Sequence, residues 1–222
     1  MFSCGSLEKD FLLRIIKEDN VSWKNLDPFQ SREILRQCIS HNLMALSFNK
    51  SDLKTLTKKD KETLIYAKKF YATRSLKIKE FEYKISEEFK KAGINHRFLK
   101  GSHLNHICYS DPTERFQRDI DILVEKGEIE PAYNKLESLG LRQHEKHPFP
   151  INFEASIKSH RHLPPVKDET GIVSVELHHR IQSEEKSNIC FVSQSMLSNY
   201  DEYGFSRSGL YFPKIELTFL HE

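Results

Sequence analysis

The chain contains few cysteines, and none of them lies in a Cys-x-x-Cys pair. The four are widely spaced, at Cys4, Cys38, Cys108 and Cys190. Zinc-binding modules and disulfide frameworks need closely spaced or paired cysteines, so neither class is supported. Unpaired cysteines are typical of a reducing compartment, and we therefore expect a cytoplasmic protein.

Long apolar runs are absent as well. No segment approaches the roughly 18 apolar residues that cross a membrane. The N-terminal sequence MFSCGSLEKDFLLRIIKED becomes charged too early for a signal peptide. The formal net charge is only +2 across 222 residues. These features predict a soluble chain without a membrane partner, and they argue mildly against a long RNA as a substrate.

The patterns that are present change at Gly93. Helical periodicity runs through residues 1–92 and is clearest in one apolar stripe, made of Ala67, Tyr71, Ile78, Phe81, Ile85 and Phe89. Gly93 ends this stripe, as a glycine after a last helical turn commonly does. We therefore predict a helical N-terminal region over residues 1–92 and a second domain over residues 93–222.

Strand and helix patterns alternate after Gly93. The predicted strands cover residues 94–99, 119–124, 141–145, 153–157 and 172–178, and the predicted helices follow Ser102 or cover residues 128–139 and 188–199. Residues 100–102 are predicted as a turn. Residues 159–166 are predicted to be extended, because Pro164 and Pro165 exclude a helix. This order indicates an α/β or α+β sheet domain.

The first candidate site is the segment RDIDILV, in which Asp119 and Asp121 alternate with apolar residues. On a strand the apolar side chains would share the buried face, and the two aspartates would stand side by side on the other. Neighbouring carboxylates repel each other unless a cation lies between them, and oxygen ligands of this kind suit Mg²⁺. A solvated polar face is the alternative interpretation, although Asp is disfavoured in strands.

Two other segments could complete this site. Gly101 and Ser102 lie between a predicted strand and a predicted helix, where a phosphate could approach the first amides of the helix. In the segment VSVELHHR, Glu176 and His178 share the polar face of a strand. If that strand pairs beside residues 119–124, Glu176 becomes the third carboxylate of a two-metal site. An ordinary capped turn and an ordinary half-buried strand are the simpler alternatives.

Together these segments resemble a known family. The run LKGSHLNHICYSDPTERFQRDIDILV, followed by HRHLPPV and VELHHRI, is similar to the uncharacterised bacterial nucleotidyltransferases of the polymerase-β-like nucleotidyltransferase superfamily. The resemblance covers roughly residues 60–222. It implies an α+β fold in which a mixed sheet with flanking helices follows the helical N-terminal region, and it makes residues 93–222 the catalytic domain.

The resemblance also implies roles for individual residues. Asp119, Asp121 and Glu176 would be the catalytic, metal-binding carboxylates, and Gly101 and Ser102 would hold the nucleotide phosphates. The expected cofactor is Mg²⁺ or Mn²⁺. The expected substrate is an NTP, with ATP favoured, although no residue of the sequence specifies the base.

Other side chains are candidates because of their chemistry. Arg115 and Arg118 could neutralise the triphosphate, or they could be ordinary surface arginines. Lys100 could contact a phosphate or simply be exposed, and His178 could line the site. The neighbouring histidines give little support for zinc, because no cysteine and no helical His-x-x-x-His pattern accompanies them.

The predicted reaction is transfer of an NMP from an NTP to an acceptor, with release of pyrophosphate. A small molecule, a peptide or a protein is favoured as acceptor over a long RNA. Two other classes stay open. One is a non-catalytic nucleotide- or partner-binding module on the same fold. The other is a metal-dependent nuclease, which does not explain the Gly-Ser turn. The sequence does not predict the oligomeric state.

The end of the chain carries one more expectation. An apolar segment starts at Phe212 and stops at Glu222, whereas the resembling family continues into more helices. We therefore expect either a shortened form of a longer protein or a naturally short member that lacks a C-terminal helical part.

Overall fold

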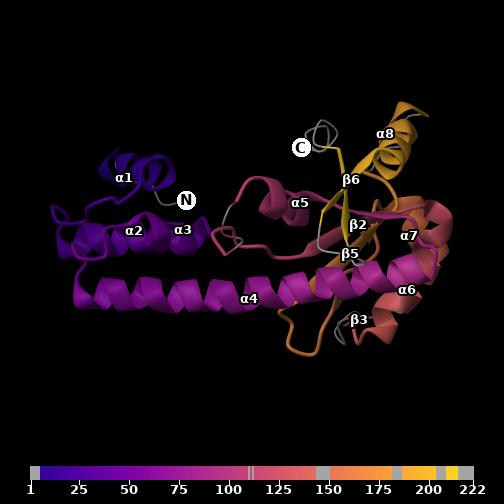
Figure 1. Ribbon diagram of the computed structural model, residues 1–222, viewed down its shortest axis with the longest axis horizontal. Coiled ribbons are helices and arrows are strands. Elements are labelled where there is room, and N and C mark those ends of the chain that lie inside the picture. The colour runs from indigo at the N-terminus through magenta and orange to yellow at the C-terminus, as the bar shows by residue number, and fades with distance from the viewer. Residues whose placement is uncertain are drawn as a thin grey trace. The chain divides into compact units, whose positions relative to one another are not determined.

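The computed structural model of the protein describes residues 6–109, 111, 113–143, 151–181, 187–203 and 209–214. The chain forms two compact units. The first unit comprises residues 1–75 and 108–116, and the second comprises residues 76–107 and 117–222. The division falls inside the long helix α4 (Lys58–Lys91), which Figure 1 shows as one continuous ribbon.

The first unit is helical. It contains α1 (Ser6–Lys17), α2 (Pro28–Ser40), α3 (Met44–Lys50) and the first part of α4. Asp27 caps α2 by accepting hydrogen bonds from the backbone of Phe29 and Gln30. The helices enclose one apolar core, in which Trp23 packs edge-on against Phe11 with ring centroids 4.9 Å apart. The helical N-terminal region predicted from the sequence is confirmed.

The second unit is built on a mixed sheet. Its strands are β1 (His96–Phe98), β2 (Ile120–Val124), β3 (Arg142–Gln143), β4 (Val166–Lys167) and β5 (Ser174–His178). They lie in the order β1-β2-β5-β4-β3. The β2–β5 pair is parallel and the other pairs are antiparallel. β6 (Tyr200–Tyr203) and β7 (Leu210–Pro213) form a separate antiparallel pair. The predicted α+β class with a mixed sheet is confirmed.

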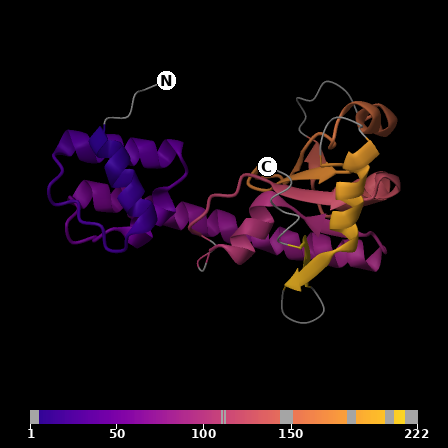
Figure 2. The same cartoon turned by 90° about the horizontal axis from the view of Figure 1, so that it is seen from above.

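The two faces of β2 meet different helices, because successive side chains of a strand point to opposite sides. Ile120 and Ile122 join the main core with residues of α4 and of α6 (Ile129–Ser138). Leu123 instead packs with Met196 and Leu197 of α8 (Ser187–Ser198). Figures 1 and 2 show α8 and α6 beside the sheet in this unit. Asp121 shares the Leu123 side of the strand, and this side carries the candidate site.

Two sequence predictions are wrong. Residues 100–102 are not a turn but begin α5 (Lys100–Ile107). Residues 153–157 are not a strand but belong to α7 (Phe153–Ser159), because the Asn152 side chain caps the backbone amide of Ala155 and Phe153 and Ile157 stand four residues apart.

The other element predictions are confirmed in type, with shorter strands than expected. The short 3-10 turn η1 (Lys126–Glu128) precedes α6. Residues 144–145 of the predicted strand 141–145 lie outside the described residues. So do residues 215–222, on which the expectation about the C-terminus depends. Within the described residues, no helix is long and apolar enough to cross a membrane.

Candidate active site

Parallel pairing of β2 and β5 brings two carboxylates together. Asp121 and Glu176 are direct register partners, and neighbouring strands lie about 4.8 Å apart, so both side chains emerge next to each other on one face. Asp121 is buried, with 2% of its surface exposed, whereas Glu176 is half-buried. The strand pairing that would unite Glu176 with the aspartates is therefore present.

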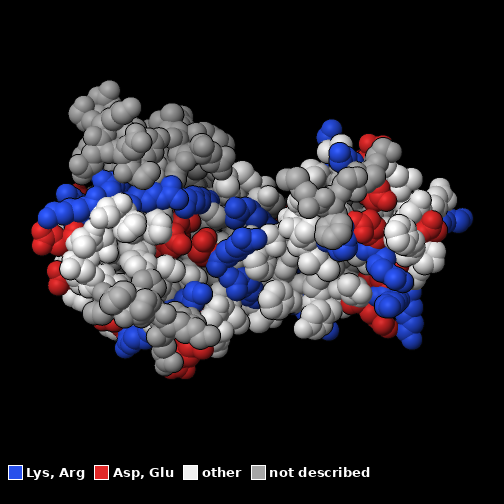
Figure 3. Space-filling view, turned by 180° about the vertical axis from the view of Figure 1, so that it is seen from behind, with Lys and Arg blue, Asp and Glu red and all other residues white. Residues whose placement is uncertain are grey.

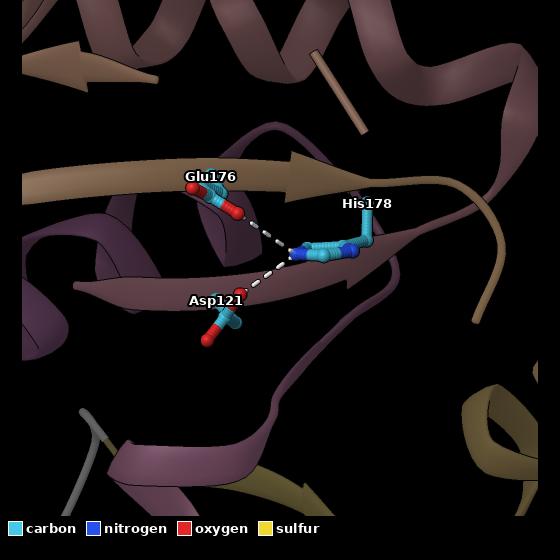
Figure 4. Close-up of side chains that lie close together, drawn as sticks. All are labelled: Asp121, Glu176 and His178. Carbon is cyan, nitrogen blue, oxygen red and sulfur yellow. Dashed lines mark hydrogen bonds and ion pairs between the residues drawn. The ribbon is translucent and has the colours of Figure 1, made fainter. Parts of the chain in front are cut away.

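His178 points between these carboxylates, as Figure 4 shows. Its Nε2 atom lies 2.8 Å from Oδ1 of Asp121 and 3.6 Å from Oε2 of Glu176. The ring is fully buried, and within the described part of the chain its Nδ1 atom has no hydrogen-bond partner. A buried N–H without a partner is costly, so the proton belongs on Nε2, where it can be donated to Asp121.

Lys100 supplies a positive charge at the same place. Its Nζ atom donates a hydrogen bond to Oδ1 of Asp121 at 2.7 Å. Lys100 is the first residue of α5 and has a φ of +43°, in the left-handed region that residues other than glycine seldom adopt. This backbone conformation turns the chain from β1 into α5 directly beside β2.

Asp119 stands one residue before β2 and is half-buried. Burial raises the pKa of its carboxyl, and the nearby charges of Asp121 and Glu176 raise that pKa further. The two neighbours have the opposite balance. Burial raises the pKa of Asp121, but hydrogen bonds from His178 and Lys100 outweigh it and lower the pKa. The neighbouring His178 ring lowers the pKa of Glu176.

These carboxylates fit a divalent cation. One donor atom from each of Asp121, Glu176 and His178 lies within 4.8 Å of the others. Burial first, and then the charges of Asp121 and Glu176, raise the pKa of Asp119, and a cation would relieve the repulsion among the three carboxylates. Asp119, Asp121 and Glu176 would hold the metal through oxygen atoms. His178 suits the role of hydrogen-bond donor better, because ligation by Nε2 would move its proton to Nδ1.

The predicted phosphate-binding residues begin α5. Gly101 and Ser102 are both buried, and Ser102 is 1% exposed. The Ser102 hydroxyl already has a partner inside the protein, since its Oγ atom accepts a hydrogen bond from Nε2 of Gln117 at 2.9 Å. The hydroxyl is thus already engaged by Gln117, and backbone amides at the start of a helix are the other groups that could meet a phosphate.

The remaining candidates are two arginines, and His162 is an additional neighbour of the site. Arg118 is exposed and directly precedes Asp119 in the chain, and Arg115 belongs to the first unit. The rings of His162 and His178 lie 5.0 Å apart, and Nδ1 of His162 lies 3.9 Å from Oε2 of Glu176. His162 thus joins the edge of the site.

Sequence reasoning missed two buried polar residues beneath the site, Glu82 and Gln117. Glu82 interrupts the apolar stripe of α4 at a position of helical spacing, next to Ile78 and Ile85. A glutamate within an apolar helix stripe could have been recognised from the sequence as a buried polar residue. Gln117 had no such signal, because it lies in an irregular segment before β2.

A mixed sheet with adjacent carboxylates on paired strands, next to a helix start, is consistent with a nucleotidyltransferase fold. Comparison with protein families agrees, since a model of a family described as uncharacterised nucleotidyltransferase matches residues 27–221. The chain belongs to this family. Neither the curated proteins nor the solved structures contain a significant match to it.

Proposed function

We propose that this protein is a metal-dependent nucleotidyltransferase that moves an NMP from an NTP to an acceptor and releases pyrophosphate. The observation that carries the proposal is the register pair Asp121–Glu176, with Asp119 close enough for electrostatic coupling. Family membership supports the same reaction class. Mg²⁺ or Mn²⁺ is the proposed cofactor and ATP the first nucleotide to test.

Each residue of the site has its own role in this proposed reaction. Asp119, Asp121 and Glu176 would hold the cation, which, when bound, would neutralise phosphate charge and lower the pKa of the attacking hydroxyl. His178 keeps the Asp121 carboxylate oriented through its 2.8 Å contact. The amides at the start of α5 would bind phosphate oxygens. When a cation binds Asp121, the Lys100 ammonium could leave that carboxylate and contact a phosphate instead.

The acceptor is proposed to be a small molecule, a peptide or a protein. On the face that Figure 3 shows, Lys and Arg side chains occur together with Asp and Glu side chains and uncharged surface. The net charge of +2 agrees with such a mixture. A long RNA would favour a more strongly basic surface. We also propose residues 93–222 as the catalytic domain.

A screen of the four NTPs with Mg²⁺ or Mn²⁺, run with and without a panel of hydroxyl-bearing small molecules and peptides as acceptors, tests the proposal. Nucleotide binding and pyrophosphate release are read separately. Pyrophosphate release that needs the metal supports transfer. Binding without release favours a non-catalytic module, and cleavage of added nucleic acid without NTP consumption favours a nuclease. The nuclease alternative has less support, because it gives no role to the helix start at Gly101.

A further inference from the structure

A buried polar cluster lies beneath the start of α5. Glu82 of α4 is 1% exposed, although its helix neighbours Ile78, Ile85 and Phe89 belong to the apolar core. A carboxyl group at such a position is costly to bury unless polar partners satisfy it. Burial raises the pKa of Glu82. Its Oε2 atom lies 4.0 Å from Nε2 of His106, whose pKa burial lowers to about 4.

Gln117 connects this carboxyl to the proposed site. Its Nε2 atom lies 3.1 Å from Oε1 of Glu82, 2.9 Å from Oγ of Ser102 and 2.9 Å from the backbone oxygen of Asp119. Its Oε1 atom accepts a hydrogen bond from Asn105 at 2.8 Å. The side chain is buried, with 6% of its surface exposed. One amide group therefore contacts both α5 and the residue before β2.

We propose that Gln117 is a positioning residue for nucleotidyl transfer and that Glu82 anchors it. Gln117 sets the spacing between the helix start, where phosphates would bind, and the carboxylate of Asp119. This inference rests on the proposed function but names a residue outside the ligand set. Small displacements of reacting groups are expensive, since a shift of about 1 Å can cost on the order of 100-fold in rate.

An exchange of the two side chains separates positioning from mere stability. Gln117→Glu places a second carboxylate against Glu82 and removes the donor to the Asp119 oxygen. Combining Glu82→Gln with Gln117→Glu restores a donor and an acceptor between the two positions. The double variant still lacks a donor to Asp119. Glu82→Gln alone is the conservative control, because the new amide oxygen still accepts from Gln117.

The measurements are thermal stability, metal-dependent pyrophosphate release per folded molecule, and Mn²⁺ affinity without nucleotide. We expect Gln117→Glu to lose stability, activity and Mn²⁺ affinity. We expect the double variant to regain stability but to keep a loss of activity of about 10- to 100-fold and a several-fold weaker Mn²⁺ affinity. If Gln117→Glu does not fold, Gln117→Met carries the same activity and affinity test.

Two results would contradict the role proposed for Gln117. A double variant whose activity and Mn²⁺ affinity recover together with its stability overturns the inference, as does a folded Gln117→Met with wild-type values. Ser86→Ala is the matched control, because Ser86 is buried one helical turn from Glu82 and bonds to Gly209 and His96 instead. It should lose stability and keep activity. A wild type that releases no pyrophosphate with any NTP and acceptor of the screen rejects the proposed function, whereas the Mn²⁺ affinities still test Gln117.

Discussion

Asp121 and Glu176 face each other across a parallel strand pair, as register partners of β2 and β5. Parallel pairing of this kind places their side chains on one face, and the same alternation sends the neighbouring apolar residues into the core. The site therefore depends on the central strands of the sheet, which cannot shift by one residue without exchanging carboxylates for apolar side chains.

Asp119→Asn and Asp121→Asn should change stability in opposite directions at pH 7 in EDTA. The raised pKa of Asp119 means that its charge opposes folding, so Asn should raise the melting temperature, by about 1–4 °C. The lowered pKa of Asp121 means that its charge favours folding, and Asn should cost about 1–3 kcal/mol.

The pH dependence of these two effects gives a second check. The stabilising contribution of Asp121 is present above its ordinary pKa of 3.8 and is lost as the pH falls through the lower folded value. The cost of Asp119 appears as the pH rises from 3.8 through its raised folded value. In thermal melts between pH 3 and 8, the difference in melting temperature between each variant and the wild type should become smaller at acid pH. Equal shifts of the same sign at pH 7 would contradict the charge assignment.

Lys100→Met should tighten the binding of Mn²⁺ in the absence of nucleotide. The Lys100 ammonium now occupies the Asp121 oxygen that a cation would use, and a partly exposed ion pair is worth about 1 kcal/mol, or roughly 5-fold in affinity. The same variant should bind NTP more weakly, since it lacks a phosphate partner. Calorimetric titration measures both affinities, and weaker Mn²⁺ binding would show that Lys100 supports the metal instead of competing with it.

His178→Gln should lower activity by about 10- to 100-fold, and by the same factor with Mg²⁺ and with Mn²⁺. The reason is that His178 acts as a donor to Asp121 in this account. A nitrogen ligand would favour Mn²⁺ over Mg²⁺. Loss of the Mn²⁺ activity alone would therefore make His178 a ligand.

Ser51→Ala should destabilise the first unit by about 1–3 kcal/mol. The Ser51 hydroxyl accepts a hydrogen bond from the indole of Trp23 at 2.8 Å, and this contact is buried. Trp23 is the single tryptophan of the chain, so its fluorescence follows the core of this unit during denaturation. An unchanged unfolding midpoint would show that water replaces the lost acceptor.

The sequence was informative where side-chain periodicity and burial coincide. Strand alternation predicted the polar positions of Asp121 in β2 and of Glu176 and His178 in β5, whereas Asp119 stands one residue before β2. Register was not predictable, because it depends on which strands pair. Only the structure shows that β5 lies next to β2 and that Asp121 faces Glu176.

Local chemistry explains what was mispredicted or missed. Residues 153–157 contain apolar side chains that fit either period, and the cap from Asn152 decides for a helix. The buried state of Glu82 contradicts the usual preference of glutamate for the surface. Its partner Gln117 stands 35 residues further along the chain, so their contact arises only in the folded unit.

Metal-dependent pyrophosphate release by Asp121→Asn, Glu176→Gln and Asp168→Asn, each compared with the wild type, tests the central claim most directly. Asp168 is the matched control, because it is an ion-paired aspartate of the same unit whose partner is Lys77. The two register partners should each lose at least about 100-fold in rate, as expected for ligands of a catalytic metal, while Asp168→Asn keeps the wild-type rate per folded molecule. Wild-type release by the folded Asp121→Asn and Glu176→Gln variants would contradict the account.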